Sequence, residues 1–300
     1  MAAGFVPPLF FMSHPKIVTG QSSPVLVVGM HRSGTRLLAE VLDRLGIFMG
    51  ADQQADAESV TFMLLNEAIL HQCGAFWSEP MAAHFVLAEP ETVSQLAWGT
   101  ATMLDRQKAN YLGLSSGAVS SDPDETRRFG WKDPRNTFTL PVWRHLFPDL
   151  KVIHIVRHGV DVAVSLARRH SEALQVATGK TVPGALTVIR DQTLAILSSR
   201  RGWTLSEALT MWEQYVEKAR LESAELGENV LEICFEELLE QPGRVIADVA
   251  KFCDVPDVIE GTAFLERVNS IRAYAYRQKP ELVEFAESER AVLAQYGYSP

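Results

Sequence analysis

Short, mostly apolar runs alternate along this chain with longer segments in which apolar residues recur at helical spacing. The short runs cover Val25–Val28, Phe129–Trp131, Lys151–Val156 and Val230–Cys234. Apolar runs of this length, bounded by polar residues or glycine, are typical of buried parallel strands. The pattern therefore predicts four strands.

Helical periodicity fills most of the chain between these strands. After the first strand, Leu37, Leu38, Val41, Leu42 and Leu45 recur at helical spacing, and Gly46 is a typical stop. Further helices are predicted at 61–71, 91–112, around Leu140–Phe147, and at 160–169, 186–200, 204–226, 236–240, 243–253 and 281–295. Three segments are predicted as loops by their polar residues or their Gly and Pro: 51–60, 115–126 and 171–185.

Strands that alternate with helices predict an α/β fold with a P-loop-like central parallel sheet, flanked by helices and carrying helical insertions. The chain has 300 residues, which suits one enlarged α/β domain better than a string of modules. We expect an irregular arm at 1–23, rich in Pro, Ser and Gly, and a single domain at 24–300. Residues 51–126 and 171–226 are predicted as insertions in that domain.

Composition excludes several classes of protein. Hydrophobic residues make up 47% of the chain and charged residues 22%, which excludes a disordered chain. No apolar run approaches the roughly 20 residues that a membrane-spanning helix needs. A net charge of −9 argues against a nucleic-acid partner. The three widely spaced cysteines fit neither a disulfide framework nor a zinc site, so we expect a reducing, cytoplasmic compartment.

The first candidate site is the junction after the strand Val25–Val28. A buried strand, a glycine-bounded turn and a helix start bring backbone N–H groups to one point, which is a geometry that binds phosphate. The spacing Gly29-x-x-x-x-Gly34 matches the first half of a nucleotide P-loop, but Thr35-Arg36 stands where Lys-Ser/Thr is required. The cation is Arg32, inside the turn.

A second candidate site follows the strand Lys151–Val156. Arg157 lies at the junction with the next helix, and Ser165 lies eight residues further on, two turns along that helix. An arginine and a hydroxyl that converge in this way suit a second anionic group.

Together the two segments resemble the donor-binding motifs of the sulfotransferases that use 3′-phosphoadenosine 5′-phosphosulfate (PAPS). The first is similar to their 5′-phosphosulfate loop in an R-S-G-T form, and the second to their 3′-phosphate motif. Three further segments resemble the same superfamily: the WKDPR stretch Trp131–Arg135, Val230–Phe252, and the ending Tyr296–Tyr298. The resemblance spans about residues 25–298.

The resemblance implies that PAPS is the co-substrate and that residues of both motifs bind it. Phe235, at the place of a usual Tyr, and Arg277, in the basic stretch Arg272–Lys279, are expected to join them. The predicted donor-binding residues are His31, Arg32, Ser33, Gly34, Thr35, Arg36, Arg157, Ser165, Phe235 and Arg277. Arg36 departs from the usual Ser or Thr.

For catalysis the resemblance points to Arg32, Lys132 and Glu58. Positioned cations at the departing phosphate oxygen suit the loose, in-line transfer of a sulfuryl group, and no metal is expected to be needed. Glu58 matches the general base of this branch by its distance from Asn66-Glu67, although Ala57 replaces the usual aromatic before it. Asp56 and Glu67 are the alternatives.

The insertions 51–126 and 171–226 are expected to lie on the acceptor side of the site. The acceptor class stays open at this point: a small molecule, a glycan or a peptide with a hydroxyl or an amine. Two other functions also stay open. A P-loop kinase or nucleotide hydrolase would need a lysine at position 35 and a hydroxyl at 36. A protein of the same fold could also bind the nucleotide without catalysis.

Overall fold

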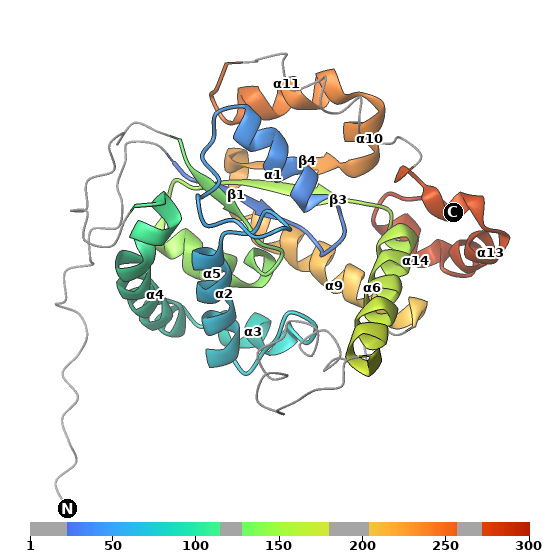
Figure 1. Ribbon diagram of the computed structural model, residues 1–300, viewed down its shortest axis with the longest axis horizontal. Helices are drawn as coiled ribbons and strands as arrows, with labels where there is room; N and C mark the ends of the chain where they lie inside the picture. The colour runs from blue at the N-terminus through green and yellow to red at the C-terminus, as the bar shows by residue number, and fades with distance from the viewer. Residues whose placement is uncertain (1–22, 115–127, 180–203, 257–271) are drawn as a thin grey trace, which may run out of the picture.

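A four-stranded parallel sheet lies at the centre of the protein (Figure 1). The computed structural model describes residues 23–114, 128–179, 204–256 and 272–300. The strands are β1 (Val25–Val28), β2 (Gly130–Lys132), β3 (Lys151–Val156) and β4 (Val230–Cys234), in the order β2-β1-β3-β4. All four predicted strands are confirmed, β2 with a shift of one residue.

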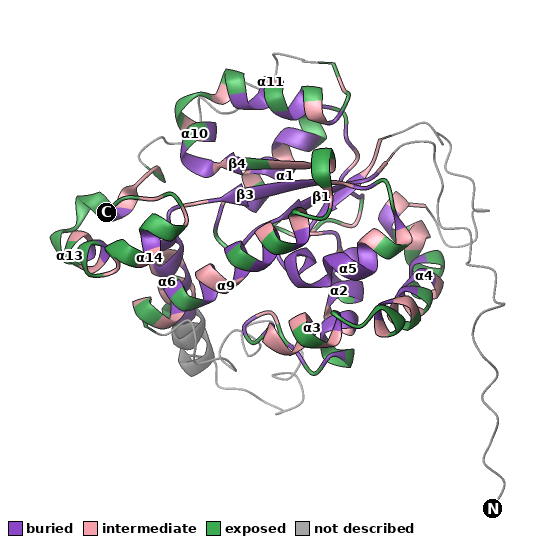
Figure 2. Ribbon diagram, turned by 180° about the vertical axis from the view of Figure 1, so that it is seen from behind, coloured by how far each residue is buried: buried purple, intermediate pink, exposed green. Residues whose placement is uncertain are grey.

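Alternate residues of the strands face two separate hydrophobic cores. Val25 and Val27 pack on one side of the sheet, and Leu26 and Val28 pack on the other. Helices α1 (Thr35–Arg44) and α11 (Pro242–Phe252) cover the first side, while α5 (Asn136–Leu146), α6 (Gly159–Gly179) and α9 (Leu205–Ser223) cover the second. Strands β1, β2 and β3 are accordingly buried on both faces, whereas the edge strand β4 is partly exposed (Figure 2). The predicted fold class is confirmed.

The remaining helices lie outside these two layers or at their ends. They are α2 (Val60–Gln72), α3 (Met81–Val86), α4 (Pro90–Leu112), α10 (Phe235–Glu240), α13 (Pro280–Ser288) and α14 (Arg290–Gln295). Two short 3₁₀ helices cover Gly227–Asn229 and Ala275–Gln278. Among the helices that the structure describes, none is long and apolar enough to cross a membrane.

Two predicted boundaries are wrong. Residues 171–185 were expected to form a loop, but α6 continues to Gly179, because the breakers Gly179 and Pro183 lie in the second half of that segment. The single helix expected at 281–295 is two helices, interrupted at Glu289. The loop expected at 115–126, the helix expected at 186–200 and most of the arm at 1–23 lie outside the described residues. The proposed domain limits stay a prediction.

Candidate active site

The carboxyl ends of all four parallel strands meet at one edge of the sheet, and each predicted motif begins there. The turn Gly29–Gly34 follows β1, Lys132 ends β2, Arg157 follows β3 and Phe235 follows β4. In parallel α/β sheets this edge is the usual place for a ligand. The topology therefore gathers four segments, of which the first and the last are more than 200 residues apart in the sequence.

The turn after β1 depends on its two glycines. Gly29 has a φ of 140°, and a Cβ there would lie 2.5 Å from the carbonyl oxygen of Ile155. Gly34 has a φ of 95°, and a Cβ there would overlap the ring of Phe235. Gly34 precedes the first residue of α1, whose N-terminus has no side-chain cap. The close approach of β3 and Phe235 therefore requires glycine at both positions, and the absence of a side-chain cap leaves the N-terminus of α1 available to an anion.

Arg32 and Arg157 connect the turn to the segment after β3. Nε of Arg32 donates a hydrogen bond to Oγ of Ser165 at 2.8 Å, and Nη1 of Arg157 donates to the carbonyl oxygen of Arg32 at 3.3 Å. The guanidinium of Arg157 lies 4.7 Å from the ring centre of Phe235. The two motifs therefore form one continuous basic surface.

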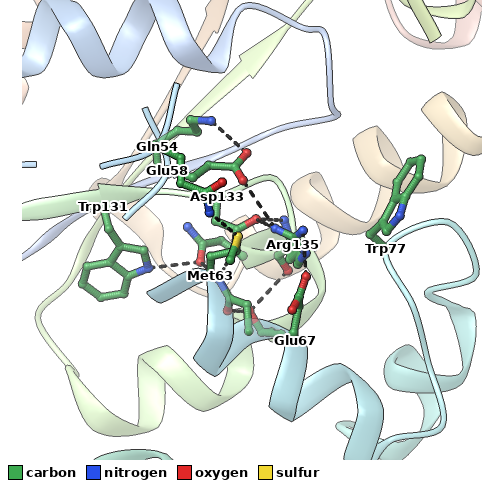
Figure 3. Close-up of polar contacts among 12 residues, drawn as sticks. Gln54, Glu58, Met63, Glu67, Trp77, Trp131, Asp133 and Arg135 are labelled. Carbon is green, nitrogen blue, oxygen red and sulfur yellow. Dashed lines mark hydrogen bonds and ion pairs between the residues drawn. The ribbon is translucent and has the colours of Figure 1, made fainter. Parts of the chain in front are cut away.

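Lys132 and Glu58 form a largely buried ion pair at the end of β2. Nζ of Lys132 lies 2.9 Å from Oε1 of Glu58, and their side chains are 2% and 12% exposed. Arg135 lies 3.6 Å from the other carboxylate oxygen of Glu58 (Figure 3). Burial and the neighbouring Asp133 raise the pKa of Glu58, although Lys132 and Arg135 oppose the rise. A carboxylate with a raised pKa beside a cation is suited to accept a proton.

A buried hydrogen-bond network centred on Asn66 holds Glu58 opposite Lys132. Asn66 lies on α2, which begins two residues after Glu58, and its Nδ2 donates to Asp133 at 2.9 Å and to Asn136 at 2.8 Å. Its Oδ1 accepts from Thr139 and from Trp143. All four hydrogen-bonding positions of the Asn66 amide are used, so α2 has one well-defined position against the Lys132–Asn136 segment.

A cavity of about 700 Å³ joins these groups. Seven basic and three acidic side chains line it, in a chain whose net charge is −9. The lining residues are His31, Arg32, Gly34, Thr35, Arg36, Leu37, Glu40, Arg44, Asp56, Glu58, Lys132, Pro134, Arg157, Arg169, Phe235 and Arg272. The acidic protein therefore has a local site that favours an anion.

Nine of the predicted site residues line this cavity and three do not. Ser33 is a buried residue of the turn itself, and Ser165 accepts a hydrogen bond from Arg32. Arg277 stacks on the ring of Tyr274 at 4.3 Å, while Arg272, from the same basic stretch, lines the cavity instead. Of the alternative bases, Asp56 lines the cavity, whereas Glu67 pairs with Arg135 at 3.1 Å.

Sequence reasoning missed Arg169 and Arg44. Arg169 lies on α6 one turn after Ser165, and Arg44 lies on α1 two turns after Arg36. The helical spacing from predicted residues was the available signal for both. Burial, followed by the neighbouring Arg169, lowers the pKa of Arg32. These like charges stand close together, and a bound anion would relieve their repulsion.

Several buried polar atoms around the turn fit an anionic or hydroxyl-bearing ligand. Within the described ranges, Nε2 of His31, Oγ of Ser33 and Nε of Arg157 have no hydrogen-bond partner. Burial, with Arg169 and other nearby cations, holds the pKa of His31 well below its usual range. His31 is therefore neutral at neutral pH and adds no charge to the turn.

His158, directly after Arg157, should make the stability of the fold sensitive to acid. Burial lowers its pKa to about 4, so the folded chain binds this proton less readily than the unfolded chain. The contribution of neutral His158 to the free energy of unfolding is complete above the ordinary histidine pKa and is lost as the pH falls towards 4. We expect the free energy of unfolding to fall by about 2 kcal/mol from this group between about pH 7 and pH 5.

Urea titrations at the two pH values test this prediction. In the variant His158→Asn the side-chain oxygen can replace Nδ1 as acceptor for the backbone N–H of Val160, but it does not titrate. The variant should lose about 2 kcal/mol less than the wild type over this range. Equal losses in both proteins would show that His158 does not carry the acid sensitivity.

Comparisons with known proteins assign the chain to a family. Similar solved structures include the sulfotransferase domain from the curacin biosynthetic pathway (19% identity, 80% of this chain and 76% of that chain covered, TM-score 0.46). Another is the sulfotransferase domain of the Synechococcus PCC 7002 olefin synthase (19% identity, 83% of this chain and 78% of that chain covered, TM-score 0.43). A third is a sulfotransferase from Alicyclobacillus acidocaldarius (15% identity, 91% of this chain and 92% of that chain covered, TM-score 0.46). The search of curated proteins gives no match. A family model described as "Sulfotransferase family" matches residues 24–259, and the chain therefore belongs to the sulfotransferase family.

Proposed function

We propose that this sulfotransferase uses PAPS as its donor and transfers the sulfuryl group to a hydroxyl or amine acceptor by in-line displacement. The observation that carries the proposal is that the turn after β1, Arg157 and the Lys132–Glu58 pair all line the same cavity. A donor with two anionic groups needs a cation at each of them, and the cavity offers Arg32 after β1 and Arg157 after β3. Glu58 supplies a carboxylate beside them.

The residues present fit the donor in charge and in hydrogen bonding. The N-terminus of α1, Arg32 and Thr35 would hold the 5′-phosphosulfate, and Arg157 would hold the 3′-phosphate. Phe235 supports Arg157 from one side and closes the turn at Gly34. Arg169 and Arg272 add positive charge along the cavity wall.

The chemistry needs one proton acceptor and a cationic environment for the departing phosphate. The acceptor oxygen or nitrogen forms a bond to sulfur while the bond from sulfur to the bridging phosphate oxygen breaks. Glu58 takes the acceptor's proton, and Lys132 and Arg32 stabilise the negative charge that develops on the bridging oxygen. The protein cations supply this stabilisation, so we propose that no metal ion takes part.

The kinase alternative has less support from the local geometry. At position 36, where a P-loop kinase holds its metal with a hydroxyl, this chain has an arginine whose side chain is 61% exposed and paired with Glu40 at 2.7 Å. Position 35 is a threonine in place of the phosphate-binding lysine. The acceptor and the cytoplasmic location stay predictions.

A transfer assay in excess EDTA tests the proposed function. PAPS labelled in its sulfuryl group is incubated with the protein and an extract of the cells that encode it. We expect a labelled product together with release of adenosine 3′,5′-bisphosphate (PAP). A strict requirement for Mg²⁺ would favour the kinase. Tight PAP binding without transfer to any acceptor would favour a non-catalytic nucleotide-binding protein.

A further inference from the structure

A buried carboxylate, Asp161, joins Arg157 to a segment more than a hundred residues away. Its Oδ2 accepts from Nη2 of Arg157 at 3.1 Å and from the backbone N–H of Ala275 at 3.1 Å, and its Oδ1 accepts from the N–H of Tyr276 at 2.9 Å. Nη2 of Arg157 also donates to the carbonyl oxygen of Arg272 at 2.9 Å. Asp161 thus fixes both the arginine and the segment 272–276.

A second buried carboxylate, Glu236, holds the residue after Arg157. Its Oε1 accepts from the backbone N–H of His158 at 3.0 Å, and its Oε2 accepts from the hydroxyl of Tyr298 at 3.2 Å. The His158 ring stacks on Tyr276 at 4.4 Å, and its Nε2 lies 3.1 Å from the carbonyl oxygen of Ser299. The last residues of the chain therefore pack against the turn that carries Arg157.

These contacts matter because an unsupported arginine is a poor recognition element. Its long side chain would lose rotamer freedom on binding an anion, whereas a side chain already held in place loses less. Arg157 is held by Asp161, by the Arg272 carbonyl and by the Phe235 ring. Neither Asp161 nor Glu236 lines the cavity, so both act through Arg157 and not on the ligand.

We propose that Asp161 and Glu236 are positioning residues that set the preference of the donor site for a nucleotide carrying a 3′-phosphate. They do so by holding Arg157 between the turn after β3 and the docked segments 272–276 and 298–299. This inference rests on the proposed function, because it assigns the 3′-phosphate to Arg157. It concerns the selectivity of binding and is independent of the acceptor.

Calorimetry with PAP and with AMP, which lacks the 3′-phosphate, tests the inference on the full chain. Asp161→Asn keeps the shape but removes the charge, and Tyr298→Phe keeps the ring but removes the hydroxyl at Glu236. We expect the preference for PAP over AMP to fall about tenfold in Asp161→Asn and about threefold in Tyr298→Phe, with AMP affinity within about twofold of the wild type. Glu172→Gln, which breaks an exposed pair on the same helix, is the matched control and should keep the preference.

The AMP affinity of each variant separates positioning from folding. Equal losses for PAP and AMP would mean that the contacts only stabilise the fold, and this would overturn the inference. A preference that survives both substitutions, or a gain in PAP affinity from removing the negative charge of Asp161, would also overturn it. Equal affinity of the wild type for PAP and AMP would overturn the proposed donor and this inference with it.

Discussion

Replacement of Glu58 by glutamine should lower the rate of sulfuryl transfer by about 10²–10⁴-fold while PAP binding stays close to that of the wild type. The glutamine keeps the shape of the side chain and can still accept the hydrogen bond from Lys132. It loses the ability to take a proton. Single-turnover rates and PAP titrations on the same preparation measure the two quantities separately.

Acceptor acidity and pH give this prediction its sharpest test. The rate loss should shrink for acceptors of low pKa, because an ionised acceptor needs no base. Burial raises the pKa of Glu58, so the wild-type rate should rise with pH at a higher pH than an ordinary glutamate would give, and the variant should lack this rise. Glu67→Gln is the matched control, since Glu67 belongs to the same network but does not line the cavity. Normal turnover of a high-pKa alcohol by Glu58→Gln would transfer the role to Asp56.

Replacement of Lys132 by methionine should lower kcat by about 10²-fold or more, a scale set by the loss of one electrostatic donor at the transition state. PAP affinity should fall much less, because the ammonium matters most when charge develops on the bridging oxygen. The comparison of kcat with the affinity for PAP therefore distinguishes a transition-state role from ground-state binding.

Loss of a buried cation also destabilises a protein, so this test needs a control variant that loses a similar buried ion pair away from the cavity. Lys218 supplies it: Lys218 forms a buried ion pair with Glu222 on α9, away from the cavity, and its side chain is 6% exposed. Lys218→Met and Lys132→Met should both lower the thermal midpoint, but only Lys132→Met should lower kcat. A similar fall of kcat in both variants would reduce Lys132 to a structural residue.

The parts of the fold that sequence predicted well are those governed by local rules. A strand buried on both faces, as Val25–Val28 is, must be apolar at every position, and a glycine turn followed by helical periodicity marks its junction with α1. The order of strands and helices also placed Arg32 directly after one strand and Arg157 directly after another. These features need no knowledge of distant contacts.

The features that sequence missed depend on packing between distant segments. Nothing local shows that Arg272, and not Arg277, reaches the cavity, because that choice depends on how Asp161 anchors the segment and on Arg277 stacking on Tyr274. The extension of α6 was missed because a glycine and a proline were weighed without their position in the segment. The ion pair of Lys132 with Glu58 joins residues 74 positions apart. Sequence reasoning assigned the two residues separate roles and did not pair them.

The hydrogen-bond network centred on Asn66 has a consequence for protein engineering. The amide of Asn66 uses all its hydrogen-bonding positions on the segment after β2. The contacts of α2 with that segment therefore place Glu58 opposite Lys132. Helices α3 and α4 follow α2 in the chain and contribute no residue to the cavity lining. Substitutions at exposed positions of residues 76–112 should therefore leave the placement of Glu58 opposite Lys132 unchanged.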